Sequence, residues 1–267
     1  FFIHIISYSP TCIYIIVRVI LTSMMQKNNS NHSGLSVFTR NSATIFTLLL
    51  AVVIPCLGKA LLVTSKERTY ESSIVSWFHK SVPSVILSIS KILALVFSTK
   101  GCIAILVLLA ALSLFINKNW KMTIIQLLIS LLPMIYIFAV KFAVNRPRPY
   151  IGLNIKLPPD PSFPSGHTSA AVAVCVMAML ILYINKPSSV QFGLLFSAIL
   201  VVIVAVSRII VAAHFPTDVL AAAIIYPLLS VTILRSFQRH NLYIDNRNDD
   251  KSTYEEQVLD SNSQSNI

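Results

Sequence analysis

The sequence predicts an all-α membrane protein: a polytopic bundle of six transmembrane helices with one further helix lying at the membrane interface. The first observation is composition, because 55% of the residues are hydrophobic, only 12% are charged, and the mean hydropathy is +0.74. A soluble domain carries about a quarter charged residues. The second observation is that the apolar residues gather in runs close to the about 20 residues that cross a bilayer as a helix.

The chain divides into three predicted parts, which are an N-terminal segment (1–43), a six-helix membrane domain (44–240) and a polar, disordered tail (241–267). The tail is rich in Asn, Asp and Ser and too polar to form a core. Residues 1–23 make a poor membrane span and lack the basic start of a cleavable signal peptide. We expect translation to begin at Met24 or Met25, with residues 1–23 an upstream extension of the reading frame.

Six apolar runs are predicted to span the membrane: Thr44–Val63, Gly101–Ile116, Met122–Val140, Thr168–Ile184, Phe192–Val206 and Val219–Leu234. The second and fifth runs are short and must include flanking residues to cross the bilayer. Pro55, Pro133 and Pro227 fall inside spans, where neighbouring helices tolerate them as kinks.

The stretch Ser84–Phe97 is apolar but too short for a seventh span, because it reaches only about 21 Å as a helix. Lys91 at its centre would also cost about 2.5–3.5 kcal/mol on insertion. We therefore expect residues 71–98 to form a helix at the interface, with three side chains at headgroup level: Trp77, Phe78 and His79.

Basic residues predict the orientation of the bundle. With six spans, one side of the membrane receives Arg40, Lys118, Lys121, Lys186, Arg235 and Arg239. By the positive-inside rule this side is cytoplasmic, as are both termini. The opposite side also carries cations, namely Lys141, Arg146, Arg148 and Arg208, and it holds His167 and His214. Cations that break the rule need another reason, so we expect a functional site on the extracytoplasmic face.

Three short patterns lie on that face. The first runs from Lys141 to Arg148-Pro149, the second is Pro164 to His167, and the third joins Ser207-Arg208 to His214 and Asp218. The cations Lys141, Arg148 and Arg208 are suited to bind a phosphate dianion. The second pattern opens a helix, whose free N–H groups form an anion site beside Ser165 and Gly166.

The two histidines predict the chemistry. Asp218 lies four residues after His214, so its carboxylate can hold one imidazole nitrogen while the other attacks phosphorus and forms a phosphohistidine. His167 has no acidic neighbour in its motif and suits a general acid that protonates the leaving oxygen. Between Ile74 and Asp245 the only carboxylates are Asp160 and Asp218, too few for a two-metal site. We therefore expect no metal and no cofactor.

The patterns together closely resemble the type 2 phosphatidic acid phosphatase superfamily, whose signature reads KxxxxxxRP, PSGH and SRxxxxxHxxxD. The resemblance implies a six-helix core, with His214 as nucleophile, Asp218 as its partner and His167 as general acid. It implies phosphate binding by Lys141, Arg148, Ser165, Gly166 and Arg208. The short loops and the Arg-Pro-Arg-Pro run are similar to bacterial members, which implies the bacterial cytoplasmic membrane.

The expected function is metal-independent hydrolysis of a phosphorylated membrane lipid, of the undecaprenyl diphosphate or phosphatidate type. A lipid A phosphatase or a phosphotransferase would use the same residues. A transporter or a catalytically silent scaffold is the alternative class, although five of the six spans lack Asp, Glu, Lys, Arg and His. A nucleic-acid partner is disfavoured, because the net charge of +11 is spread between apolar runs.

Two charged residues of the site face lie outside the specified motif positions. Arg146 is interpreted as a headgroup anchor, since Arg at a span end commonly binds lipid phosphates. Asp160 stands between prolines and is interpreted as a turn residue.

Overall fold

The computed structural model describes residues 34–63, 65–152 and 158–239, and this part of the chain contains helices and no strand. The α-helices are α2 (Gly34–Val63), α3 (Ser65–Ser81), α4 (Ser84–Val96), α5 (Thr99–Asn117), α6 (Trp120–Val144), α7 (Gly166–Asn185), α8 (Val190–Ile210) and α9 (Pro216–Arg239), with a short 3-10 turn, η1 (Pro187–Ser189). The all-α prediction is confirmed. The predicted N-terminal segment and tail lie mostly outside the described residues.

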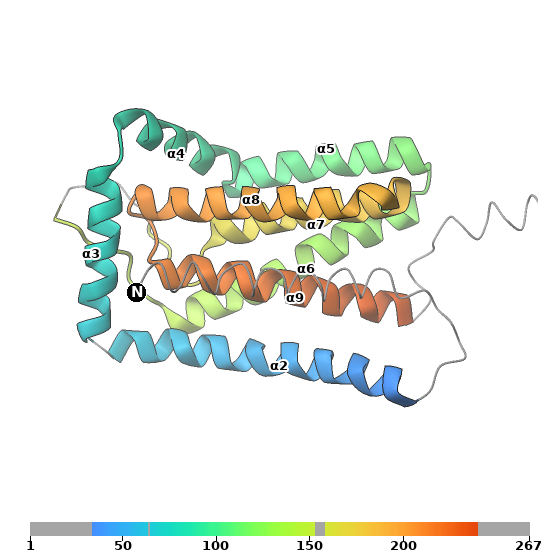
Figure 1. Cartoon of the computed structure of the whole chain (residues 1–267), viewed down its shortest axis with the longest axis horizontal. Helices are drawn as coiled ribbons and strands as arrows, with labels where there is room; N and C mark the ends of the chain where they lie inside the picture. Colours follow the sequence, from blue (N-terminus) through green and yellow to red (C-terminus); the bar gives the residue numbers. More distant parts are fainter. Residues whose placement is uncertain (1–33, 64, 153–157, 240–267) are drawn as a thin grey trace, which may run out of the picture.

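Six helices of the described part are long and apolar enough to cross a membrane: α2, α5, α6, α7, α8 and α9. They run side by side along the long axis of the molecule (Figure 1). The prediction of six spans is therefore confirmed, and the chain is a multi-pass membrane protein. Their ends reach beyond the predicted apolar runs, so that α6 extends to Val144 and includes Lys141, and α7 begins at Gly166.

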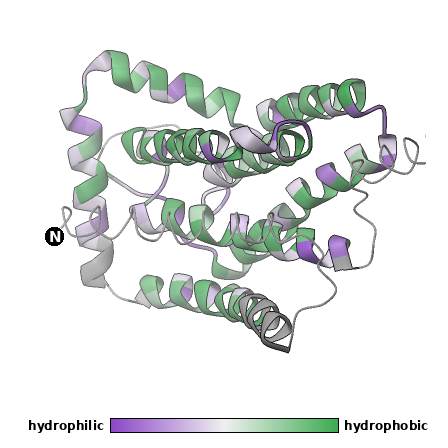
Figure 2. Ribbon diagram, turned by 45° about the vertical axis from the view of Figure 1, so that its right-hand side comes forward, coloured by the Kyte–Doolittle hydropathy of each residue, from purple (hydrophilic) through white to green (hydrophobic). Residues whose placement is uncertain are grey.

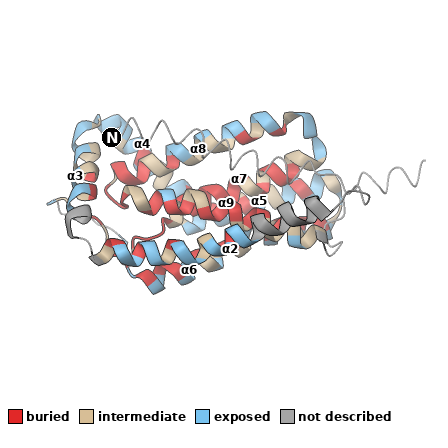
Figure 3. Cartoon of the chain, turned by 60° about the horizontal axis from the view of Figure 1, so that its bottom comes forward, coloured by how far each residue is buried: buried red, intermediate tan, exposed pale blue. Residues whose placement is uncertain are grey.

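The centre of the bundle is α7, whose span is 67% buried, followed by α9 at 56%. Figure 3 shows the buried residues gathered along these two helices. Large apolar side chains point outward from the surrounding helices, with Phe115 82% exposed and Phe192 77% exposed. The bundle helices are hydrophobic over most of their length in Figure 2. An apolar exterior of this kind is stable only against lipid chains.

The predicted interfacial stretch 71–98 forms two helices rather than one, because α3 and α4 meet at a bend of 115°. Pro83 lies at the bend and caps α4, with the backbone N–H of Leu87 donating to its carbonyl at 3.2 Å. A proline disfavours the helical conformation of the residue before it, so α3 cannot continue through Val82. Helix α3 crosses the end of the bundle where α2 finishes and α4 starts (Figure 1).

The turns between spans bring the three motifs to this same end. Asn145 ends α6 with a left-handed φ of 54°, and its N–H donates to the Lys141 carbonyl at 3.0 Å. Asparagine tolerates this conformation better than most residues. Ser165 caps α7, with its Oγ accepting from the N–H of Thr168 at 3.4 Å. Helix α9 begins at Pro216 and holds Asp218 in its first turn.

Candidate active site

His214 is completely buried in the turn between α8 and α9, and each of its ring nitrogens has a defined partner. Nδ1 lies 2.8 Å from the carbonyl oxygen of Ser162 and 3.6 Å from the carboxylate of Asp218. Since both partners accept, the hydrogen bonds place the proton on Nδ1. Nε2 is then an acceptor, 3.3 Å from the Arg148 guanidinium. Burial lowers the pKa of His214 to about 4, so its ring is neutral at neutral pH.

Asp218 is also fully buried and its two oxygens have different partners. Oδ1 accepts from the Arg146 guanidinium at 2.7 Å, while Oδ2 accepts from the backbone N–H of Phe215 at 2.8 Å and from the Ser162 hydroxyl. Asp218 was predicted as the partner of His214, and in the structure it shares Nδ1 with the Ser162 carbonyl. Ser162 was missed, since a serine two residues before a motif has no distinguishing signal in the sequence.

Arg146 is the centre of a buried ionic network and not a headgroup anchor. Its side chain is 2% exposed, forms ion pairs with Asp218 and Glu71, and donates to the Thr217 hydroxyl at 2.7 Å. Glu71 from α3 also accepts from the backbone N–H of Thr217 at 3.1 Å and from its hydroxyl at 2.7 Å. The interpretation of Arg146 was wrong because a buried carboxylate from the transverse helix α3 was not foreseen.

Lys141 and Arg148, two of the predicted phosphate-binding cations, meet on the carboxylate of Asp160. The Lys141 ammonium lies 2.5 Å from one oxygen of Asp160, and the Arg148 guanidinium lies 2.8 Å from the other. Partial burial opposes the charge on Asp160, but these contacts with Lys141 and Arg148 prevail and lower its pKa to about 2. Asp160 therefore does more than form a turn, since it is the counter-ion of the predicted phosphate site.

The N-terminus of α7 borders these cations. The backbone N–H of Ser165 donates to the Asp218 carbonyl at 3.0 Å. The next two N–H groups, of Gly166 and His167, lie in the first helical turn and have no intrahelical acceptor. A Cβ at Gly166 would lie 3.9 Å from the Lys141 ammonium, so lysine and helix start face one space. This arrangement suits an anion.

Arg208 and His167 are held by α4, which sequence reasoning did not include in the site. Arg208 is 1% exposed and donates to the Ser90 carbonyl at 2.5 Å and to the Ser207 hydroxyl at 3.0 Å. His167 forms a hydrogen bond with the backbone of Ala94, one turn further along α4. The rings of His167 and His214 have their centroids 6.4 Å apart. Of the three predicted phosphate-binding cations, Lys141 and Arg148 thus share Asp160, while Arg208 binds to a carbonyl of α4.

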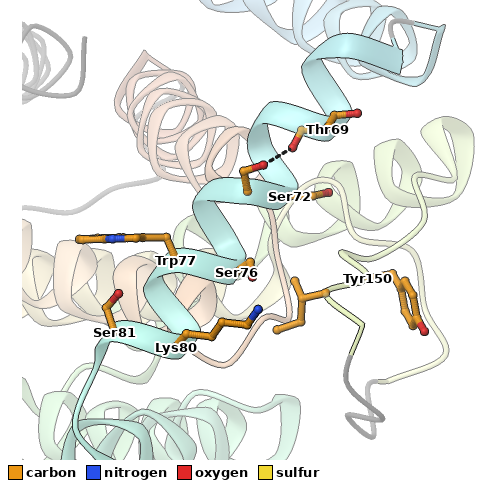
Figure 4. Close-up of a pocket in the computed structure, with 9 residues that line it drawn as sticks. Thr69, Ser72, Ser76, Trp77, Lys80, Ser81 and Tyr150 are labelled. Atoms are coloured by element: carbon orange, nitrogen blue, oxygen red, sulfur yellow. Dashed lines mark hydrogen bonds between the residues drawn. The ribbon is translucent and has the colours of Figure 1, made fainter.

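A separate groove runs along the outer face of α3 next to Tyr150 (Figure 4). Hydroxyl side chains such as Ser72 and Ser76 line it, together with Trp77 and Lys80, and no motif residue does. Trp77 is 64% exposed, as expected at headgroup level. His79 instead faces the bundle, with Nδ1 2.8 Å from the Ile210 carbonyl.

The site thus combines two imidazoles with two cations near a helix N-terminus. A neutral imidazole with an unprotonated Nε2 can act as a nucleophile, and the cations and N–H groups can bind the charge that develops on phosphate oxygens. This combination suits transfer of a phosphoryl group.

Comparisons with known proteins agree with the motifs. The sequence model of the PAP2 superfamily matches residues 104–242, which contain all three motifs but not Glu71, Ser90 or Ala94. Among solved structures, the fold is similar to a transmembrane PAP2-type phosphatidylglycerolphosphate phosphatase from Bacillus subtilis, with a TM-score of 0.59 and 20% identity, covering 75% of this chain and 96% of that one. No curated protein sequence matches the chain significantly.

Proposed function

The chain belongs to the PAP2 superfamily of membrane phosphatases, and we propose that it hydrolyses phosphate or diphosphate esters of membrane lipids through a phosphohistidine formed on His214. One observation carries this proposal. The Nδ1 proton of His214 is engaged by Ser162 and Asp218, which leaves Nε2 directed at the position where Arg148 would bind phosphate. The two other catalytic assignments are Asp218 and His167, and the phosphate-binding residues are Lys141, Arg148, Ser165, Gly166 and Arg208.

In the first step, the Nε2 lone pair of His214 forms a bond to phosphorus as the bond from phosphorus to the lipid oxygen breaks. His167 gives its proton to that oxygen, so that the lipid leaves as an alcohol or a lipid monophosphate. The His214 ring becomes cationic, and the carboxylate of Asp218 and the carbonyl of Ser162 stabilise this charge. Lys141, Arg148 and the α7 N-terminus bind the equatorial phosphate oxygens.

In the second step, His167 takes a proton from water, and the resulting oxygen attacks phosphorus. The bond to Nε2 breaks, inorganic phosphate leaves, and His214 returns to its neutral form. A lipid alcohol or sugar in place of water would make the same residues a phosphotransferase, and a lipid A phosphate would be hydrolysed in the same way. Phosphate release in water without an added acceptor distinguishes hydrolysis from transfer, and a transporter or scaffold would release none.

The substrate class follows from the position of the site at the helix ends of an apolar bundle. We infer a lipid of the phosphatidate or undecaprenyl diphosphate type, whose chains stay in the bilayer while the phosphate reaches Lys141 and Arg148. A soluble phosphate ester would gain few contacts beyond the phosphate itself. Membrane anchoring instead raises the local concentration of a lipid and restricts its orientation.

We therefore expect kcat/KM to be roughly a hundredfold or more higher for long-chain than for short-chain phosphatidate in one detergent system. Phosphate release is measured for long-chain, short-chain and soluble monoesters at matched pH. Equal efficiency across chain lengths would contradict the lipid assignment and leave the phosphatase activity standing.

We also propose that catalysis needs no metal ion. Both carboxylates near the motif histidines are already paired with cations of the protein, Asp160 with Lys141 and Arg148, and Asp218 with Arg146. Phosphate release should therefore persist in EDTA, and vanadate, which adopts five-coordinate geometry, should inhibit. Loss of activity in EDTA that magnesium restores would overturn this part of the mechanism.

The active site is proposed to face the extracytoplasmic side, with both termini in the cytoplasm. In a variant with the native cysteines replaced, Tyr150→Cys introduces a thiol at an 81% exposed position at the site end, and Ser188→Cys one at the opposite end. A membrane-impermeant maleimide added to intact cells should label the first and not the second. The reverse labelling would place the site in the cytoplasm.

A further inference from the structure

An anion of the protein itself lies at the proposed phosphate site, and that anion is the side chain of Asp160. One carboxylate oxygen binds the Lys141 ammonium at 2.5 Å and the other binds the Arg148 guanidinium at 2.8 Å. The cations are nearly enclosed, with side chains 4% and 9% exposed, whereas Asp160 is 40% exposed. Asp160 therefore lies on the open side of the two cations, and a substrate phosphate must take its place.

Only the side chain of Asp160 has to move for this exchange. Its backbone carbonyl accepts from the Arg148 Nε at 3.0 Å, and two residues later the N–H of Ser162 donates to the Arg146 carbonyl at 2.7 Å. These contacts hold the loop against the end of α6. The carboxylate can rotate toward its exposed side, and it stays tethered beside the cations at a high effective concentration.

The exchange depends on the charge of the incoming group. A phosphodiester carries one negative charge, as the Asp160 carboxylate does, so it gains no charge attraction over a competitor that is already in place. A phosphate monoester or a terminal diphosphate carries close to two charges at neutral pH, and both cations attract it more strongly. The bilayer offers phosphodiester headgroups in large excess at the same depth, so a cationic site there needs a means of excluding them.

We propose that Asp160 is a tethered competitor at Lys141 and Arg148, which weakens the binding of every anion by the same factor. Dianionic phosphate groups then still bind these cations, whereas the more weakly attracted monoanionic phosphodiesters of the surrounding lipids are excluded. The proposal rests on the proposed function, because it assumes that these two cations bind the substrate phosphate. It assigns Asp160 no part in bond breaking. Loss of its charge should therefore change the affinity for anions more than the turnover of a saturating substrate.

The test measures anion binding without turnover, by the melting temperature of the whole protein in detergent at constant ionic strength. At about pH 8.5 inorganic phosphate is a dianion and dimethyl phosphate a monoanion. His214, with a pKa near 4, stays neutral at this pH. Binding to the folded state raises the melting temperature in proportion to RT ln(1 + [L]/Kd). For the wild type we expect phosphate to bind at least about tenfold more tightly than dimethyl phosphate.

Asp160→Asn removes the charge and keeps the size of the side chain. It should tighten the binding of both anions by about tenfold, because a tethered competitor lowers both affinities by the same factor. Asp160→Glu restores a carboxylate and should recover the weaker binding. Gln191→Lys is the matched control, because it adds the same unit of charge at an exposed position at the other end of the bundle and should change nothing. In parallel, phosphatidylglycerol should inhibit phosphatidate hydrolysis by Asp160→Asn at roughly tenfold lower mole fraction than it inhibits the wild type.

Comparable binding of both anions by the wild type would overturn the proposal whether or not the variants fold, and so would unchanged affinity for both anions in a folded Asp160→Asn. If the binding pattern appears as expected but the wild type releases no phosphate from any lipid, the hydrolytic function fails and the competition by Asp160 stands.

Discussion

Replacing His214 with alanine should lower kcat by roughly 10⁴-fold or more and abolish any covalent phosphoenzyme. The reason is that the unprotonated Nε2 of His214 lies beside the Arg148 guanidinium, and alanine leaves no nitrogen there to attack phosphorus. The measurement is phosphate release, together with acid-quench trapping of radiolabelled phosphohistidine from labelled substrate.

His167→Ala should lower kcat by about 10²–10⁴-fold, in keeping with loss of a general acid. The deficit should shrink for a substrate with a good leaving group such as nitrophenol, while that of His214→Ala should not. His79→Ala is the matched control, since this histidine lies at the same end of the bundle and its ring bonds the Ile210 carbonyl, away from the motif residues. Near-normal activity in His214→Ala would refute the assignment of the nucleophile.

Replacing Arg146 with methionine should destabilise the protein by about 3–5 kcal/mol, the usual cost of removing one partner from a buried ion pair. Two carboxylates, Glu71 and Asp218, would remain buried without their cation. Thermal unfolding in detergent measures this loss. Arg146→Lys should recover only part of it, because an ammonium lacks the planar fork that contacts both carboxylates and Thr217 together.

The Arg146 network also predicts an effect on activity. Glu71→Gln and Arg146→Met should both lower the rate of phosphate release. The two effects should be far from additive in the double variant, because both substitutions disrupt one network. Lys186→Met, at an exposed position at the opposite end, provides the control for removal of a cation. If Arg146→Met unfolds at the wild-type temperature, the network contributes nothing to stability, and Arg146 need not position Asp218.

The sequence alone determined the fold class and the six spans, and it supplied the motif residues of the proposed site. Hydropathy is a local property, and a bilayer requires every spanning segment to be an apolar helix, so the runs could be found without knowledge of their packing. The helices extend past the predicted runs, because polar residues such as Lys141 continue a helix beyond its apolar run. The single interfacial helix was wrong in form, since it breaks at Pro83.

Tertiary structure decided which groups meet. Glu71 and Arg146 are 75 residues apart in the chain, and Ser90 and Arg208 are 118 apart, so no short pattern could link them. The stretch 71–98 looked like one interfacial helix in the sequence, yet α3 and α4 supply the carboxylate and the carbonyls that hold Arg146, Arg208 and His167. Asp160 looked like a turn residue until the fold placed it on Lys141 and Arg148. A charged group leaves water only where an opposite charge or a hydrogen-bond partner meets it, and the packing of the helices decides where that is.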